Sequence, residues 1–187
     1  MMSALDALCP THAKVLAGEI PEVKNSPAML TAIGRIDDRL ANSELRDIVR
    51  DQSVDKNLAW SVSMIGTLGN AVESIHQSCL VRLAAVTVAW LETYGFTMED
   101  IMMAIADERL RQRQLFAARK LSFRFDSPAV SPFRKLRVLT EEIGEVAEAI
   151  DDLEAHPKSP IRRQHLITEL VQVAAVTVAW LESLEAK

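Results

Sequence analysis

The sequence predicts an all-α protein made of two tandem helical repeats, and three observations support this prediction. Gly, Pro and Tyr are scarce, with 6, 7 and 1 among 187 residues, while helix-forming residues dominate. Apolar residues recur every three to five positions along most of the chain, as on one face of a helix. The segment AAVTVAWLE occurs unchanged at residues 84–92 and 174–182, so Trp90 and Trp180 are predicted to fill equivalent core positions.

Residues 1–100 are predicted to form the first repeat, preceded by an irregular arm. Pro10, Pro21 and Pro27 interrupt the start of the chain, which favours irregular structure there. Helical spacing then predicts helices over residues 29–49, 58–75 and 79–94. Gly95 follows the third helix as its C-cap, because glycine adopts a positive φ without steric cost.

Residues 101–187 are predicted to form the second domain, which ends in a helical hairpin. Just before it, Thr97 caps a helix that runs to about Lys120. A linker is predicted at 122–132. The hairpin that follows is predicted to consist of a helix over 132–154, a loop over 155–160 and a helix over 161–185. Pro160 suits the first turn of that last helix.

Composition disfavours several classes of function. The net charge of −5 makes nucleic acid an unlikely partner. Two cysteines are too few for a disulfide framework, which favours a reducing cytoplasm, and the N-terminus lacks the pattern of a secretory signal. The longest uncharged stretch, residues 57–72, is shorter than the roughly 20 apolar residues of a membrane span, so no membrane partner is predicted.

Four polar side chains of the hairpin are predicted to face one another. Glu142 and Glu145 are three residues apart and share one helix face, and the same holds for Glu169 and Gln172. Glu145 and Glu169 each lie 12 residues from Pro157 in the loop. Glu142 and Gln172 each lie 15 residues from it, so the four side chains form two rungs of an antiparallel hairpin.

These carboxylates indicate a site for a divalent cation. Glu142 and Glu145 alone also fit a solvated helix face, since EExxE is common in helices. Glu169 changes this interpretation, because Leu166 and Val173 flank it at helical spacing and it therefore borders an apolar stripe. A carboxylate in that position needs a neutralising partner, and Mg²⁺ binds carboxylate oxygens together with substrate phosphates.

The order and spacing of these motifs resemble a known family. EExxE at residues 141–145, followed after a loop by ELVQVAA at 169–175, is similar to the EExxE and ExxD signature of the MazG-like all-α nucleoside triphosphate pyrophosphatases. The segment ERLRQ at residues 108–112 is similar to a helix that precedes the acidic hairpin in bacterial and phage-borne members. The resemblance covers residues 101–187. The first half of the chain resembles the family only through its repeat of the second half.

The resemblance implies Mg²⁺-dependent hydrolysis of a nucleoside triphosphate to the monophosphate and pyrophosphate, with Mn²⁺ as a second suitable cation. It also implies a four-helix-type bundle and a homodimer. The expected role is house-cleaning, that is, the removal of unwanted nucleoside triphosphates from the nucleotide pool. Glu142, Glu145 and Glu169 take the positions of metal ligands, with Gln172 as the fourth, where the family has Asp. The candidates for orienting the attacking water are Glu141 and Glu148, and the choice between them stays open.

Gln172 and the first repeat leave a non-catalytic alternative open. A neutral amide leaves the site one negative charge short of the family pattern. When the two halves are aligned, Thr67 and Asn70 stand where the second half has Glu142 and Glu145, so the first repeat is degenerate. The alternative is a helical interaction module whose acidic site is a relic.

A basic stretch precedes the acidic hairpin. Nine Arg and Lys residues lie between positions 109 and 137, against one acid, Asp126. This stretch suits a triphosphate, although it also fits a solvated face or a nucleic-acid patch. The predicted phosphate contacts are Arg109, Arg113, Lys120, Arg124 and Lys135. Phe116, Phe123 and Phe125 are candidates to stack on a base, although aromatic residues at this spacing more often lie in a core.

Overall fold

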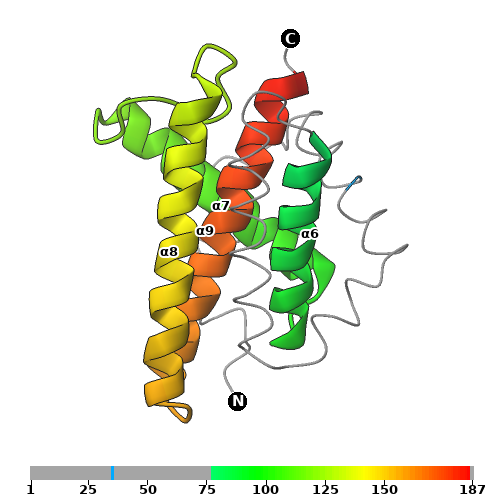
Figure 1. The fold of residues 1–187 in the computed structure, drawn as a ribbon, viewed down its shortest axis with the longest axis vertical. Helices are drawn as coiled ribbons and strands as arrows, with labels where there is room; N and C mark the ends of the chain where they lie inside the picture. The colour runs from blue at the N-terminus through cyan, green and yellow to red at the C-terminus, as the bar shows by residue number, and fades with distance from the viewer. Residues whose placement is uncertain (1–34, 36–76, 186–187) are drawn as a thin grey trace, which may run out of the picture.

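The computed structural model describes Arg35 and residues 77–185. Within these residues the chain forms four α-helices and no strand, which confirms the all-α prediction for this part of the chain (Figure 1). The helices are α6 (Gln77–Thr93), α7 (Met98–Ala117), α8 (Pro132–Ala155) and α9 (Pro160–Glu185). The helices predicted over residues 29–49 and 58–75 lie outside the described residues.

A short turn separates α6 from α7, and its residues suit it. Gly95 has a φ of 89°, the left-handed conformation expected after a helix C-terminus. Thr97 is the N-cap of α7, and its hydroxyl accepts a hydrogen bond from the Asp100 N–H group. The Asp100 carboxylate accepts from the Thr97 N–H group at 2.9 Å, which completes a capping box. With both ends capped, the chain changes direction by 120° between the two helices.

The end of α7 differs from the prediction, because the helix stops at Ala117 and does not reach Lys120. Arg119 has a φ of 57°, a left-handed conformation that a right-handed helix cannot include. The N–H groups of Arg119 and Lys120 return to the carbonyl oxygens of Phe116 and Leu115, at 2.9 and 2.8 Å. These bonds satisfy the last carbonyl groups of the helix without a glycine, so the sequence carried no glycine signal for the stop.

α8 and α9 form the predicted helical hairpin, with boundaries that differ by one residue at most from those predicted. Ser131 is the N-cap of α8, where its hydroxyl accepts a hydrogen bond from the Arg134 N–H group. Pro132 follows in the first turn, and Pro160 opens α9. Proline is favoured at both positions because its missing N–H group has no helical partner there.

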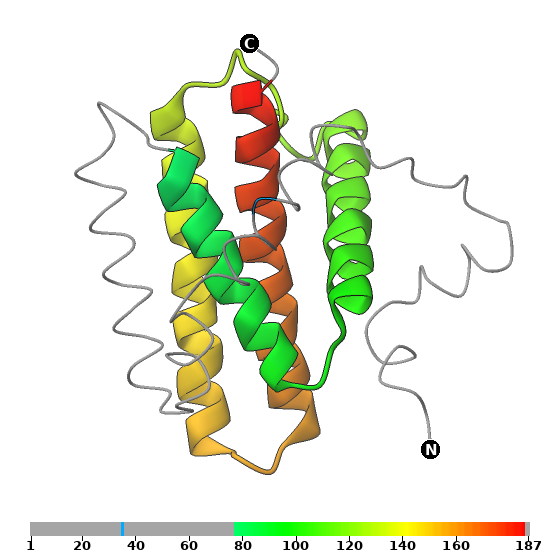
Figure 2. The same ribbon diagram turned by 90° about the vertical axis from the view of Figure 1, so that its right-hand side faces the viewer.

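α9 is the central helix, and α6, α7 and α8 pack around it (Figures 1 and 2). All residues from 173 to 181 are buried. Trp180 of α9 is 1% exposed and Trp90 of α6 is 5% exposed, so both tryptophans lie in the core. By length and composition α9 could also cross a membrane, but 89% of its apolar window is buried inside the protein, as in the core helix of a bundle.

Replacing Thr97 with Ala should lower the free energy of unfolding by about 1 kcal/mol, because the Asp100 N–H group loses its cap. Urea unfolding followed by circular dichroism measures this change. Thr140 is a matched control: it is exposed within α8, where its hydroxyl donates to the Leu136 carbonyl oxygen. Thr140→Ala should therefore change stability by less than about 0.5 kcal/mol. Equal losses in the two variants would contradict the capping role.

Candidate metal centre

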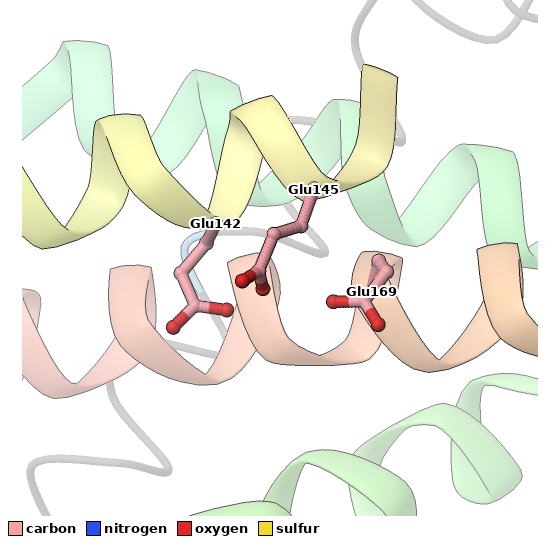
Figure 3. Close-up of side chains that lie close together, drawn as sticks. All are labelled: Glu142, Glu145 and Glu169. Atoms are coloured by element: carbon pink, nitrogen blue, oxygen red, sulfur yellow. The ribbon is translucent and has the colours of Figure 1, made fainter. Parts of the chain in front are cut away.

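Three carboxylates of the hairpin meet between α8 and α9. Glu142 and Glu145 project from α8 toward α9, and Glu169 projects from α9 beside them (Figure 3). One oxygen of each carboxylate lies within 4.8 Å of the others. The structure thus brings together the carboxylates of three of the four residues that the hairpin spacing placed at matching heights, and the fourth residue, Gln172, contacts Glu169. A set of converging carboxylate oxygens suits a hard divalent cation such as Mg²⁺.

The carboxyl group of Glu142 lies in surroundings that disfavour its negative charge. Its Oε2 atom is buried and has no hydrogen-bond partner within the part of the chain that the structure describes. Burial, followed by the charges of Glu145 and Glu169, raises the pKa of Glu142 from its ordinary 4.5 to about 7. A cation between the three carboxylates would supply the missing partner.

Glu169 is buried on the central helix, with 6% of its surface exposed. Burial raises the pKa of its carboxyl group above the ordinary value, and the charge of Glu145 adds to the rise. His165, one turn earlier, opposes this shift, with its Nε2 atom 3.2 Å from Glu169 Oε1. Two of the three carboxyl groups therefore resist ionisation unless a cation is bound.

Gln172 contacts this cluster through its amide N–H group. Its Nε2 atom donates to Glu169 Oε2 at 2.7 Å, and its Oε1 atom accepts from Arg111 Nη2 at 3.5 Å. The opposite amide orientation would set an oxygen against a carboxylate and an N–H group against a guanidinium, so these neighbours favour the one observed. Whereas the sequence predicted a metal ligand here, the amide oxygen of Gln172 faces Arg111 and its nitrogen holds Glu169.

A cavity of about 270 Å³ adjoins the carboxylates. It lies between the end of α7, the connection at residues 118–131 and α8. Its polar lining includes Glu141, Glu142, Glu145, Arg111 and Arg137. Its apolar lining consists of Leu115, Leu121, Phe123, Phe125 and Val138. The cavity therefore combines apolar surface, two guanidinium groups and part of the acidic cluster, which is the usual composition of a small-molecule site.

The three phenylalanines predicted as stacking candidates occupy different environments. Phe123 is half-buried in the cavity wall, and its ring centre lies 4.8 Å from that of Phe125. The Arg134 guanidinium lies over the Phe123 ring, 4.3 Å from its centre. Phe125 is buried in the core, and Phe116 is exposed and does not line this cavity. Phe123 is therefore the one of the three best placed to meet a ligand.

Two of the five predicted phosphate contacts lie in the interior. Arg109 is 3% exposed and forms ion pairs with Glu182 at 2.8 Å and with Asp126 at 3.3 Å. Lys135 is also buried, and its Nζ atom donates to Ser183 Oγ. Both side chains are engaged with the C-terminal part of α9, and neither lines the cavity beside the carboxylates.

The other three predicted contacts also lie outside the lining of this cavity. Arg113 and Arg124 pair with Asp126 at 3.3 and 2.7 Å, so Asp126 is shared by three arginines. Lys120 is exposed beyond the end of α7. Much of the basic stretch therefore attaches the connection at residues 118–131 to α7 and does not face the acidic cluster.

Arg111 and Arg137 line the cavity, but they were not among the predicted phosphate contacts. A two-bond ion pair with Glu108, at 2.5 and 2.8 Å, holds Arg111. Arg137 lies one helical turn before Glu141 and therefore on the same face of α8. This spacing could have indicated from the sequence that Arg137 lies near the acidic residues. Both candidates for orienting water are exposed, but Glu141 lines the cavity, whereas Glu148 lies outside its lining.

Comparison with known proteins identifies no relative, since no family model, curated protein or solved structure matches the chain. The chemistry of the site therefore has to be inferred from its geometry, burial and charge.

The raised pKa of Glu142 predicts that the metal-free protein loses stability as the pH rises. The folded-state pKa of about 7 exceeds the ordinary 4.5, so the folded state binds more protons between these values and stability should fall across that interval. Glu142→Gln removes this titration. The variant should therefore be more stable than the parent at about pH 8 and should lose less stability between about pH 5 and 8.

Urea unfolding at the two pH values, with EDTA present, measures the difference. Glu154→Gln is the matched control because Glu154 is exposed near the end of α8 and lies outside the cluster. Its pH dependence should equal that of the parent. If Glu142→Gln also keeps the parental pH dependence, the raised pKa of Glu142 is wrong.

Proposed function

We propose that this chain is a Mg²⁺-dependent nucleoside triphosphate pyrophosphohydrolase. Its role in this proposal is to remove unwanted nucleoside triphosphates from the nucleotide pool of the cytoplasm. The observation that carries the proposal is the convergence of Glu142, Glu145 and Glu169 within 4.8 Å, beside a cavity lined by arginines and two aromatic rings. Such a substrate needs carboxylates for a cation, guanidinium groups for phosphates and apolar surface for a nucleoside. The described residues offer all three next to one another.

The donor set of this cluster fits Mg²⁺. Only carboxylate oxygens converge, and one of them, Glu142 Oε2, is buried without a hydrogen-bond partner in the described residues. Glu142, Glu145 and Glu169 would hold the ion. When bound, Mg²⁺ neutralises phosphate charge and so lowers the barrier to attack by water. Mn²⁺ prefers the same kind of oxygen ligand and is the second candidate.

The side chains around the cavity supply binding and proton transfer. Phe123 and the apolar wall receive the nucleoside, and Arg111 and Arg137 bind phosphate oxygens. Glu141 accepts a proton from the attacking water while the water oxygen bonds to the α-phosphorus. The bond from that phosphorus to the bridging oxygen breaks, and its electron pair leaves with pyrophosphate. Glu141 takes this role in preference to Glu148 because it lines the cavity.

The MazG-like bundle, the tandem repeats and the homodimer belong to the same proposal. The repeats are supported by matching local contacts in the two identical segments. Thr87 donates to the Leu83 carbonyl oxygen at 2.7 Å, and Thr177 donates to that of Val173 at 2.7 Å. α6 also packs directly on α9. In this proposal the domain boundary lies near residue 100, and the first repeat covers the helix that carries Glu169.

Glu145→Gln and Glu169→Gln should each lower kcat/KM by about 100-fold or more, because they remove ligand charge without a change in shape. Pyrophosphate release from canonical and modified nucleoside triphosphates, with and without Mg²⁺, measures the effect. Glu154→Gln is the matched control and should turn over substrate like the parent. Parental turnover in both site variants would show that the cluster is not catalytic. No release by the parent from any substrate would favour the interaction module.

Arg137→Met should raise KM by about tenfold and change kcat less, because a charge-assisted hydrogen bond to phosphate acts in the ground state as well as in the transition state. Steady-state kinetics on the best substrate of the panel measures both constants. Arg119→Met is the control, since Arg119 is exposed and does not line the cavity. An unchanged KM in Arg137→Met would exclude the phosphate contact.

A further inference from the structure

A continuous series of polar contacts runs along α7 from the connection at residues 118–131 to the acidic cluster. Its successive members, each within 3.5 Å of the next, are Asp126, Arg109, Gln112, Glu108, Arg111, Gln172 and Glu169. The four middle members in α7 all belong to the ERLRQ segment at residues 108–112. The proposed chemistry uses only Arg111 of this segment, so the other three need a separate explanation.

The series alternates between carboxylate, guanidinium and amide groups, and both amides have the same orientation within it. Gln112 Oε1 accepts from Arg109 at 3.1 Å, and its Nε2 donates to Glu108 at 3.0 Å. Gln172 repeats this arrangement between Arg111 and Glu169. Each amide satisfies a cation on one side and an anion on the other. Reversal of either amide would bring like groups together.

Much of the series is withdrawn from water. Arg109 is 3% exposed and Gln112 is 8% exposed, while the guanidinium of Arg109 is also anchored to Glu182 of α9. Hydrogen bonds to charged groups are stronger in such surroundings, and the loss of one member leaves its neighbours unsatisfied. The orientation of each buried side chain therefore depends on the next one along the series. Arg111 is 53% exposed, and its two hydrogen bonds to Glu108 hold it in place.

We infer that Gln112 and Gln172 are positioning residues that hold Glu169 in the orientation in which it meets Glu142 and Glu145. This inference rests on the proposed cation site. Gln172 acts on Glu169 directly. Gln112 acts through the other members, because it fixes the Glu108 carboxylate that orients Arg111, and Arg111 in turn orients Gln172. A carboxylate at position 172 could not replace the amide here, since it has no N–H group to donate to Glu169.

The affinity of the full chain for Mn²⁺, measured from the electron paramagnetic resonance signal of the free ion, tests this inference without an activity assay. Gln112→Met and Gln172→Met nearly preserve shape and charge, so the direct attraction of the cation stays the same. Losing one hydrogen bond to Glu169 should weaken binding about fivefold in Gln172→Met. Gln112→Met should weaken it about threefold, and the double variant should bind no more weakly than Gln172→Met alone.

Gln114→Met is the matched control, because Gln114 is an exposed residue of α7 outside the series, and it should bind Mn²⁺ like the parent. Circular dichroism at the assay temperature checks the fold of each variant. Parental affinity in Gln112→Met, or independent effects that multiply in the double variant, would overturn the inference. Failure of the parent to bind Mn²⁺ would instead overturn the proposed cation site.

Gln172 is only half-buried, so its replacement leaves the core intact and gives a second test that does not require Gln112→Met to fold. The spectrum of the bound ion in Gln172→Met should differ from that of the parent, since Glu169 loses the donor that orients it. Parental affinity together with a parental spectrum in this variant would also overturn the inference.

Discussion

The structure depends on the burial of α9 by the helices that pack around it. The residues from 173 to 181 are all buried, which an apolar helix achieves only when other helices surround it. α6, α7 and α8 supply that cover (Figure 2). Each buried side chain of the size of Val or Leu contributes about 1.5–3 kcal/mol before the entropy of ordering is subtracted. The same cover means that a polar group on the inner surface of α9 must find its partner within the protein.

Glu182 and Glu169 of α9 meet that requirement in opposite ways. Glu182 pairs with Arg109 at 2.8 Å and faces Arg113 at 3.9 Å, so arginines compensate its charge. Glu169 instead faces two other carboxylates, and its Oε1 atom lies 3.2 Å from the His165 imidazole. A buried carboxylate paired with arginine has a structural role, whereas one grouped with other carboxylates lacks compensation and attracts a cation. This contrast separates the two buried acids of α9.

The hairpin and its three carboxylates could be predicted because only local quantities decide them. Heights in an antiparallel hairpin follow from the number of residues to the turn, and helix faces follow from spacing. The partners of the basic residues are not local: Arg109 meets Glu182, 73 positions away, and no periodicity reports such a pair. The end of α7 was missed because Arg119, a residue that rarely adopts positive φ, makes the turn there.

The neutral residue at position 172 also affects the repulsion between the carboxylates of the acidic cluster when no cation is bound. Glu142 has a pKa of about 7 and therefore keeps a proton part of the time near neutral pH, while Gln172 donates to Glu169. A fourth carboxylate would add repulsion and would compete with Glu108 for Arg111. The amide thus reduces the repulsion that the carboxylates would feel without a cation, but it also leaves less negative charge to attract a free cation. Under the proposed function, the oxygens of a bound triphosphate would add the negative charge that position 172 does not supply, so Glu142, Glu145 and Glu169 would hold Mg²⁺ more tightly with substrate than without it.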